Sequence, residues 1–510
     1  MATKETFVKS VSNSYTFKGE SILIGSAVLG EDYDTKCQVH IPLKTLNRHG
    51  MISGATGTGK TKSLQVIAEG LADAGVPVLV MDIKGDLSGL AQPGTNNKHI
   101  VKRAGFINME WEGRGFPIEL MSISDEPGTR LKATVSEFGP LLLAKILQLN
   151  DTQSDVLTLI FKFCDDKLLP LIDLKDIKSV LKYIQKDGKE EFIKEYGYFN
   201  TSTLGAIMRS VVGLEQQNAD ILFGEPSFDI FDLMQLTEDG KGYINTIRLT
   251  DMQSQTAIFS TFMLCLIAEI FQKLPEQGDA DKPKLVMFID EAHLIFKNAS
   301  KELLDQFETT IKLIRSKGVG IVLATQSPKD IPSEVLGQLG LKVQHALRAF
   351  TAKDRKAIKL VSENYPISEF YDIDQTITQL GIGEAFITAL DEKGRPTELV
   401  HTLMRPPYSR MDILSDAEIN YCLKKSRLIS KYNRDIDRDS AYEILEQKLI
   451  EEAKVQEIEN RKQPTTTVRK QTSRRKEKTI FDEIISSPVS KTIARELTRG
   501  LLGVLGLKRR

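Results

Sequence analysis

Residues 50–82 read GMISGATGTGKTKSLQVIAEGLADAGVPVLVMD, and this stretch decides the fold. A short apolar run leads into a glycine-rich loop at 54–61, a helical pattern follows over 62–74, and a second apolar run at 76–82 ends in an aspartate. Strand, loop, helix and strand in this order form a βαβ unit, in which the two strands run parallel. The sequence therefore predicts an α/β protein with a sheet of mainly parallel strands.

The glycine-rich loop fits the phosphate-binding pattern G-x-x-x-x-G-K-[ST]. Its residues are Gly54, Ala55, Thr56, Gly57, Thr58, Gly59, Lys60 and Thr61. Glycines at these positions let consecutive backbone N–H groups turn toward a phosphate, directly before a helix N-terminus. We expect Lys60 to reach the β- and γ-phosphates of ATP and Thr61 to hold Mg²⁺. The alternative is a glycine-rich turn that binds nothing, and the strand before the loop and the helix after it disfavour that alternative.

A later strand-like run, LVMFIDE at 285–291, ends in two carboxylates. A phosphate loop needs a carboxylate from a neighbouring strand to hold the metal, and we expect Asp290 to serve this purpose. Glu291, one residue further on, is the candidate base that polarises the attacking water. Acidic residues often begin loops, so the pair is weak evidence alone. Together with the phosphate loop it predicts hydrolysis of ATP.

Two further segments are expected at the same edge of the sheet. The strand at 320–325 is followed by Gln326, which we expect to sense the γ-phosphate or orient water. The alternative is that Gln326 only ends the strand before Pro328. The segment 82–86, DIKGD, follows the strand after the phosphate-loop helix, where α/β sheets bind ligands. A functional role and a simple turn are equally supported there.

Phosphoryl transfer also requires positive charge on the transferred group, commonly from an arginine of a neighbouring subunit. Arg315, at the end of the helix between the strands of Glu291 and Gln326, is the first candidate, and Arg348 and Arg355 follow. The alternative for each is a surface salt bridge. His293, two residues after Glu291, can brace the loop or take part in the chemistry.

Periodicity and composition divide the chain into six segments. We expect a short N-terminal β-module at 1–45, the first part of the ATPase core at 46–129, a helical insertion at 130–235, the second part of the core at 236–410, a helical extension at 411–460, and a basic linker with an amphipathic tail at 461–510. The α/β alternation that is interrupted by the insertion resumes with strands predicted at 243–249, 284–289, 319–324 and 341–347.

The charge of the chain is unevenly distributed. Of 68 basic and 69 acidic residues, 14 basic and 4 acidic residues lie within 461–510, so residues 1–460 carry a net −11. A basic tail on an acidic body suggests contact with a polyanion, either nucleic acid or an anionic membrane. A solvated, disordered extension is the alternative. The 41% apolar and 27% charged content is ordinary for a globular protein.

The cysteines and the N-terminus indicate the compartment. The four cysteines, Cys37, Cys164, Cys265 and Cys422, form no Cys-x-x-Cys pair, which disfavours a zinc site or a disulfide framework. The N-terminus has no apolar signal region, and no run of about 18 apolar residues occurs. We therefore expect a cytoplasmic protein with reduced thiols.

Four segments of the chain together resemble a known superfamily. They are NRHG at 47–50 before GATGTGKT, MDIKGDLSGL at 81–90, FIDEAHLIF at 288–296 and VLATQSP at 322–328. This set is similar to the HerA/FtsK superfamily of P-loop ATPases, and most similar to its YjgR-like bacterial group. The likeness extends from about residue 20 to the C-terminus.

The resemblance implies a RecA-like core in a ring, usually a hexamer, with ATP between subunits and DNA in the central channel. It supports nucleotide contacts by Lys60 and Thr61, metal and water contacts by Asp290 and Glu291, a γ-phosphate sensor in Gln326 and a trans-acting finger in Arg315. HerA itself begins with a fuller β-barrel. Only about 45 residues precede the core here, so we expect neither a complete barrel nor the partner docking associated with it.

Two functions follow from these patterns. The first is a ring motor that translocates on or remodels DNA, with DNA and copies of the same chain as partners. The alternative is an assembly or regulatory ATPase that acts on a protein through the N-terminal module or the tail, or at a membrane through the amphipathic segment 490–507. Membrane contact is the less expected of these. A nucleotide switch without turnover is a third, weaker reading, because a switch has no need of Glu291.

Overall fold

The computed structural model of this chain describes residues 3–462 except 34, 218, 251–255, 279, 298–300, 350, 435 and 437. The chain forms two units, residues 1–448 and 449–510, and the first contains the sheet and the candidate site. The linker after residue 462 and the amphipathic tail lie outside the described residues. No helix within the described part is long and apolar enough to cross a membrane.

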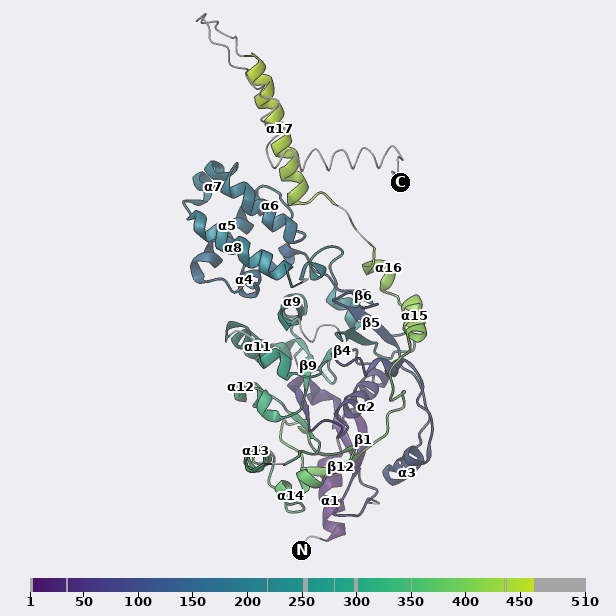
Figure 1. Ribbon diagram of the computed structural model, residues 1–510. Helices are drawn as coiled ribbons and strands as arrows, with labels where there is room; N and C mark the ends of the chain where they lie inside the picture. Colours follow the sequence, from purple (N-terminus) through teal and green to yellow (C-terminus); the bar gives the residue numbers. More distant parts are fainter. Residues whose placement is uncertain are drawn as a thin grey trace, which may run out of the picture. The chain divides into compact units, whose positions relative to one another are not determined.

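The first unit is built on one twelve-stranded sheet (Figure 1). In order across the sheet the strands are β2 (Gln38–Pro42), β1 (Ser21–Ala27), β12 (Val400–Met404), β11 (Glu384–Thr388), β10 (Leu341–Gln344), β3 (Gly50–Ser53), β9 (Val319–Thr325), β8 (Leu285–Ile289), β4 (Val78–Asp82), β7 (Ile244–Arg248), β5 (Ile118–Ser122) and β6 (Thr129–Arg130). Neighbouring strands from β10 to β6 are parallel, whereas β11, β12, β1 and β2 pair antiparallel. The predicted α/β fold with a mainly parallel sheet is confirmed.

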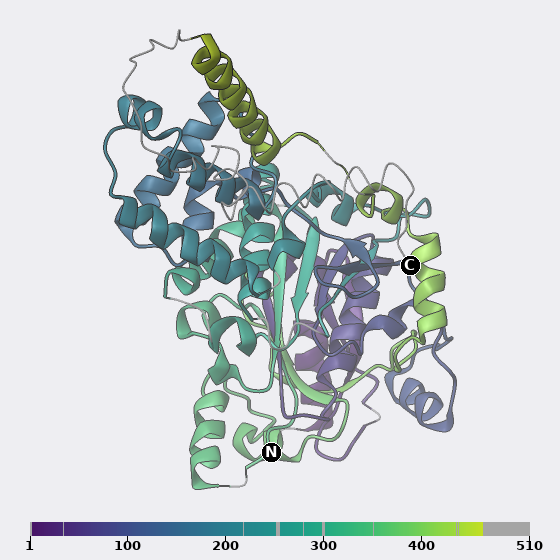
Figure 2. The same cartoon turned by 45° about the horizontal axis from the view of Figure 1, so that its top comes forward.

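Helices cover both faces of the parallel strands (Figure 2). Helix α2 (Lys60–Asp73) packs on one face, and α9 (Thr256–Lys273) and α11 (Lys301–Ile314) pack on the other. Successive side chains of a strand point to opposite faces, so on β4 Val78 joins the core around α2 and Leu79 joins the core around α9 and α11. Strands buried on both faces must be apolar at nearly every position, which explains their unbroken hydrophobic runs.

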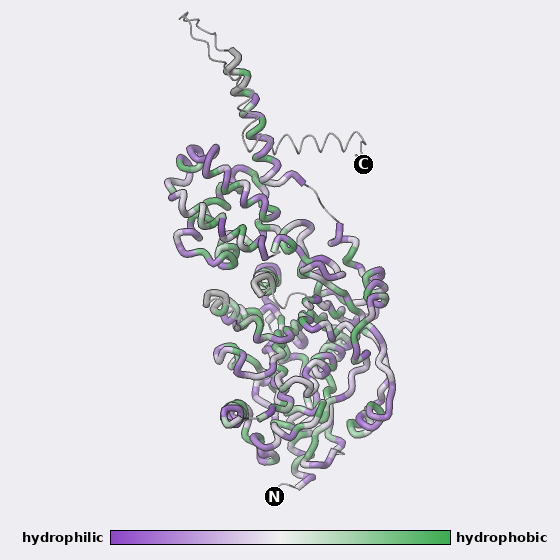
Figure 3. Tube along the Cα trace, in the orientation of Figure 1, coloured by the Kyte–Doolittle hydropathy of each residue, from purple (hydrophilic) through white to green (hydrophobic). Residues whose placement is uncertain are grey.

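The segment 130–235 is helical, as its periodicity predicted. Its helices are α4 (Val135–Ile146), α5 (Asp151–Asp166), α6 (Leu174–Gln185), α7 (Lys189–Tyr196) and α8 (Thr201–Glu215). Capping boxes begin three of them, with the pairs Thr134 and Glu137, Asn150 and Gln153, and Asp173 and Asp176. Hydrophobic and hydrophilic residues alternate along these helices in Figure 3, as expected where each helix buries one face.

The first 45 residues, where a short β-module is expected, contain one helix and two strands. Strands β1 and β2 extend the main sheet, because β1 pairs with β12 near the other end of the chain. Helix α1 (Lys4–Ser14), which the sequence analysis did not predict, buries Phe7 and Val11 against the core of α2. A pairing between residues almost 380 positions apart leaves no local signal in the sequence. The division of the chain into domains remains a prediction.

The structure describes eight further α-helices. They are α3 (Lys98–Ile107), α10 (His293–Lys297), α12 (Ser333–Leu336), α13 (Ala352–Ser362), α14 (Ile373–Gln379), α15 (Asp416–Lys425), α16 (Ile429–Tyr432) and α17 (Ala441–Lys462).

Candidate active site

The glycine loop between β3 and α2 has the backbone shape of a phosphate cradle. Gly54, Gly57 and Gly59 have φ angles of 151°, 77° and 113°, which side-chain-bearing residues rarely adopt. A Cβ on Gly54 would lie 2.5 Å from the Cβ of His345. Gly59 precedes α2, and no side chain caps the first N–H groups of that helix. These N–H groups can therefore bind a phosphate.

Lys60 points into this cradle. Its Nζ donates to the carbonyl oxygens of Gly54 at 2.8 Å and Ala55 at 3.2 Å. Burial and the nearby ammonium of Lys84 lower the pKa of Lys60. Phosphate oxygens bind an ammonium more strongly than carbonyl oxygens do, so a phosphate in the cradle would displace these contacts. Thr61 follows Lys60 in the first turn of α2 and is half-buried.

Three parallel strands bring the predicted groups to one edge of the sheet. Strand β9 lies between β3 and β8, with Ser53 opposite Thr325 and Ile289 opposite Leu323. The backbone N–H of Ala292 donates to the carbonyl of Ala324 at 2.8 Å, which extends the pairing past the end of β8. The carboxyl ends of parallel strands meet at the same edge of a sheet. The phosphate loop, the Asp290–Glu291 pair and Gln326 therefore all lie at this edge.

Asp290 has the properties of a cation ligand. Its side chain is almost completely buried, and Oδ1 accepts a hydrogen bond from the N–H of Glu291 at 2.9 Å. Oδ2 is buried and has no hydrogen-bond partner among the described residues. Burial raises the pKa of Asp290 to about 6. A buried acceptor without a partner is costly, and a divalent cation on the phosphate side would satisfy it.

Glu291 is held in place from two sides. Its φ of 48° lies in the left-handed region, which is unfavourable for a residue with a side chain. The carboxylate forms an ion pair with Lys84 through Oε1, and its Oε2 lies 3.1 Å from Nδ1 of His293. Of the two roles considered for His293, the geometry supports bracing of the loop.

Lys84 was not singled out in the sequence. Burial alone would lower its pKa, but the ion pair with Glu291 and the charge of Asp290 outweigh burial and raise it. Its neighbour Asp82 is buried, and its two oxygens accept from the N–H groups of Gly85 at 2.7 Å and Leu87 at 3.0 Å. Asp82 therefore shapes the turn, whereas Lys84 belongs to the site. The DIKGD segment thus serves both of the roles that the sequence left open.

Gln326 is exposed at the same edge. The turn behind it is fixed by Asp330, whose Oδ2 accepts from Thr325 Oγ1 at 3.0 Å and from the N–H of Ser327 at 3.2 Å. A rigid turn with a free amide at its start is compatible with a phosphate sensor. The assignment of Gln326 remains a prediction.

His345 packs against the phosphate loop at Gly54 and was not predicted from the sequence. Its Nδ1 donates to the carbonyl of Glu384 at 2.8 Å, which makes Nε2 the acceptor for the hydroxyl of Ser63 at 2.9 Å. Burial lowers the pKa of His345 to about 4, so the ring is neutral at physiological pH. No local pattern marks this residue, because its partners are distant in sequence.

A pocket of about 250 Å³ opens beside Gly59. It is mainly apolar, and its lining includes Ile100, Met404, Pro406, Pro407 and Met411. The guanidinium of Arg103, also in the lining, donates to the carbonyls of Gly383 at 2.9 Å and Met404 at 3.2 Å. These bonds fix the walls of the pocket next to the phosphate loop. An apolar slot in this position suits a flat heterocycle.

Arg315 is not part of this cluster. It begins the 3-10 turn Arg315–Lys317, just before β9, and therefore lies at the opposite edge of the sheet. β9 has seven residues, so its ends are roughly 20 Å apart at about 3.3 Å per residue. That is several times the reach of an arginine side chain. Arg315 therefore cannot contact a phosphate bound in its own loop.

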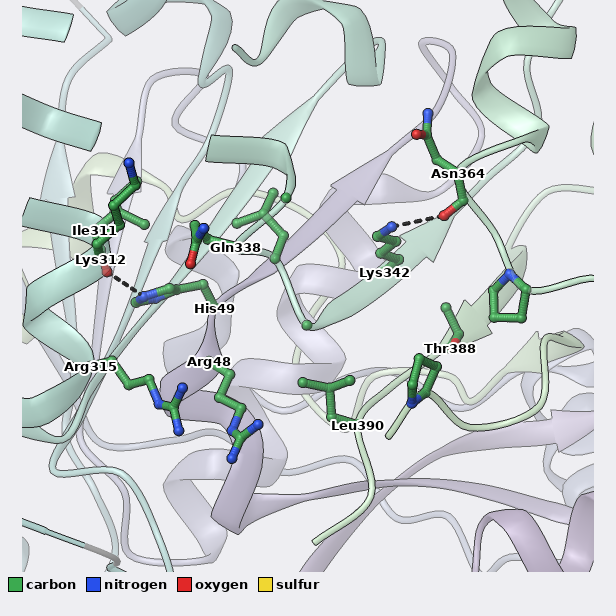
Figure 4. Close-up of a pocket in the computed structure, with 15 residues that line it drawn as sticks. Arg48, His49, Ile311, Lys312, Arg315, Gln338, Lys342, Asn364, Thr388 and Leu390 are labelled. Atoms are coloured by element: carbon green, nitrogen blue, oxygen red, sulfur yellow. Dashed lines mark hydrogen bonds between the residues drawn. The ribbon is translucent and has the colours of Figure 1, made fainter. Parts of the chain in front are cut away.

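Arg315 lines a basic pocket of about 580 Å³ together with Arg48, Lys312 and Lys342 (Figure 4). Arg48 lies two residues before the start of β3, and in the figure its guanidinium lies beside that of Arg315. His49 connects the segment of Arg48 to α11 and β9. Its Nε2 donates to the carbonyl of Ile311 at 2.8 Å, and its Nδ1 accepts from the N–H of Ile321 at 3.1 Å. The sequence analysis missed Arg48, which becomes a candidate only through its position beside Arg315.

The chain is similar to proteins of known families. A family model described as "Helicase HerA-like C-terminal" matches residues 28–510. The chain is 21% identical over 379 residues to the DNA double-strand break repair helicase HerA of Sulfolobus acidocaldarius, covering 71% of this chain and 66% of that protein. It is 23% identical over 367 residues to the HerA of Sulfurisphaera tokodaii, with the same two shares. The chain thus spans slightly less than two thirds of these relatives.

Solved structures share the fold. The bacterial conjugative coupling protein TrwB, in an unbound form, has a TM-score of 0.51 and 14% identity, covering 80% of this chain and 95% of that one. TrwB in complex with a non-hydrolysable ATP analogue has a TM-score of 0.50 and 14% identity, covering 78% and 99%. These likenesses establish the expected RecA-like P-loop architecture.

Proposed function

Because the chain belongs to the HerA-like helicase C-terminal family of P-loop proteins, we propose that it hydrolyses Mg-ATP in a homo-oligomeric ring and translocates on or remodels DNA. The observation that carries the proposal is the shared edge of β3, β9 and β8, where the phosphate loop meets the Asp290–Glu291 pair. The assignment to the YjgR-like group and the six-fold ring are parts of the same proposal. The curated HerA relatives are described as DNA repair helicases, which supports DNA as the partner.

Each residue at the carboxyl edge has its own role in ATP hydrolysis. The N–H groups of residues 54–61 and the ammonium of Lys60 bind and orient the phosphates, and the apolar pocket beside Gly59 takes the base. Thr61 and Asp290 would hold Mg²⁺, which would neutralise charge on the β- and γ-phosphates. Glu291 accepts a proton from the attacking water, and Gln326 orients that water or senses the γ-phosphate.

Arg315 acts in a neighbouring subunit. It lies before the amino end of β9, about 20 Å from the carboxyl end of that strand, which supports action between subunits over action within one chain. A head-to-tail ring places the amino edge of one sheet against the carboxyl edge of the next, and this brings Arg315 and Arg48 to the neighbour's γ-phosphate. Positive charge there stabilises the charge that develops in the transition state. Arg348 and Arg355 lie on another surface and are not the first choice for this role.

We further propose a cytoplasmic location, because ATP is an intracellular substrate and all four cysteines are free thiols. The alternative function, an assembly or regulatory ATPase with a protein or membrane partner, depends on the tail at 461–510. Nearly all of the tail lies outside the described residues, and nothing in the rest of the chain favours that function.

The test is ATP turnover of the full chain with and without duplex DNA, in wild type, Lys60→Ala and Glu291→Gln. We expect DNA to stimulate the wild type less as salt rises, because phosphate contacts are screened. Loss of the catalytic carboxylate should lower turnover at least about 100-fold. Glu238→Gln, at an exposed position away from the site, is the matched control and should behave as wild type.

Each outcome bears on a separate part of the proposal. Equal turnover in wild type and Glu291→Gln would refute the role of Glu291. Turnover indifferent to single- and double-stranded DNA of any length would refute DNA as the partner.

A further inference from the structure

A basic surface lies on α13 and on the segment that leads into it. Residues 348–359 contain five cations, Arg348, Lys353, Arg355, Lys356 and Lys359, and one carboxylate, that of Asp354. This local net charge of +4 contrasts with the net −11 of residues 1–460. We call these five side chains the α13 basic surface. A concentrated positive patch on an acidic body is a local feature that needs an explanation.

The α13 basic surface is fixed by the packing of its helix. Ile358 and Val361 are buried in a core with residues of β10, β11 and α14, so one face of the helix is anchored. Lys353, Lys356 and Lys359 are exposed and recur every third residue, which places them in one row along the outer face.

The cations of this surface form no ion pair with the described residues. The carboxylate of Asp354 accepts from the N–H of Thr351 at 2.8 Å, and so serves to cap the helix. Surface lysines usually alternate with carboxylates that screen them, and here that screening is missing along the row.

A hollow accompanies the charge. A pocket of about 580 Å³ is lined by Arg348, Arg355 and Lys359 and by the apolar Leu347 and Ile358. The carboxylate of Asp374, which also lines it, accepts a hydrogen bond from the hydroxyl of Ser362. Two guanidinium groups around a concave surface offer paired N–H donors that fit phosphate oxygens.

The α13 basic surface is joined to the nucleotide site through the backbone. The carbonyl of Ala346 accepts from the N–H of Ala55 in the phosphate loop at 2.9 Å. Arg348 follows two residues later, and α13 begins at Ala352. A ligand held by this surface therefore contacts a segment that is directly bonded to the loop that holds ATP.

We propose that the α13 basic surface binds the phosphate backbone of DNA, and that it is the contact through which DNA affects the nucleotide loop. The inference rests on the proposed function and gives it a location. Repeated cations at helix spacing match a polyanion with regularly spaced charges, and backbone contacts of this kind carry no sequence preference.

The test is binding of a fluorescent DNA duplex to the full chain at several salt concentrations between about 50 and 200 mM. The variants are the triple substitution Lys353→Gln, Lys356→Gln and Lys359→Gln and the charge-preserving triple Lys→Arg at the same positions. The matched control is Lys175→Gln, Lys182→Gln and Lys186→Gln, which removes three exposed lysines of and just after α6. Thermal unfolding of every variant verifies that it is folded.

Each released phosphate contact contributes about 0.9 to the slope of log affinity against log salt. We therefore expect the Lys→Gln triple to reduce that slope by about 2 to 3 and to weaken binding more than tenfold at low salt. The Lys→Arg triple and the α6 control should keep the wild-type slope. An unchanged slope in the Lys→Gln triple, with wild-type DNA binding intact, would overturn the inference and leave the proposed function standing. A wild-type chain that binds no DNA would instead overturn the proposed function, and this inference with it.

Discussion

At the scale of single residues, Glu291 is the most constrained side chain of the site. It combines an unfavourable φ of 48° with almost complete burial, an ion pair to Lys84 and a contact with His293. In the proposed mechanism, the attacking water has to bind a carboxylate oxygen that Lys84 or His293 now contacts. Lys84 therefore sets how readily the carboxylate can act, and it also compensates the buried charge of Asp290.

Replacement of Lys84 by Met should destabilise the protein. The variant keeps the apolar stem but leaves two buried carboxylates without their cation. We expect a loss of about 1–2 kcal/mol in the free energy of unfolding, less than for a fully buried pair because Lys84 is 38% exposed and partly screened. Denaturant unfolding in the presence of a chelator measures this loss, and Mg-ADP should reduce it.

Lys162→Met is the matched control, because its partner Asp166 is exposed. We expect a much smaller change there, because water screens an exposed pair. Losses of equal size in the two variants would contradict the role given to Lys84.

Two buried histidines should make stability depend on pH. Burial lowers the pKa of His49 and of His345 to about 4, whereas an unfolded chain has a histidine pKa near 6.5. Between these values the unfolded chain binds more protons, so stability rises with pH. Each neutral, buried histidine makes its full contribution to the free energy of unfolding above about pH 6.5. This contribution is lost as the pH falls toward 4, by up to about 3 kcal/mol for each histidine.

Urea unfolding at pH 7.5 and 5 checks this dependence. His49→Gln should make stability less dependent on pH, even if it also lowers stability at both values. The exposed His99→Gln should leave the dependence as in wild type. An unchanged dependence in His49→Gln would show that His49 is not held neutral.

At the scale of elements, the features that could be predicted from the sequence are those that leave a local pattern in it. The phosphate loop was predictable because its glycines need backbone angles that other residues avoid, and the inner strands because burial on both faces makes them uniformly apolar. The Asp290–Glu291 pair followed, since parallel strands end at one edge. Arg48, His345 and Lys84 were missed because each acquires its role from a contact distant in sequence.

The loop geometry can be tested with two glycines. Gly54→Ala places a Cβ 2.5 Å from that of His345 at a φ of 151°, so the loop must shift. We expect affinity for a fluorescent ATP analogue to fall more than tenfold. Gly105→Ala, in α3, meets nothing within 4 Å and should keep the affinity while it stabilises the helix by about 0.5–1 kcal/mol. Normal nucleotide binding by Gly54→Ala would contradict the cradle.

At the scale of the whole molecule, the two ends of the parallel strands carry different groups of the candidate site. The carboxyl edge of the sheet holds the phosphate loop and the carboxylates, and its amino edge holds Arg48 and Arg315 in a basic pocket. In the proposed function, a complete site requires two copies of the chain in a head-to-tail contact, and a ring repeats that contact. Hydrolysis would then depend on assembly of the chains.

The most direct test of this account is to mix two inactive variants. Lys60→Ala lacks the phosphate-binding lysine and Arg315→Ala lacks the finger, and each alone should turn over ATP at least about 100-fold more slowly than wild type. In randomly mixed rings about one interface in four joins an intact loop to an intact arginine. The account predicts that an equimolar mixture recovers roughly a quarter of wild-type turnover. A mixture no more active than the average of the separate variants would contradict it.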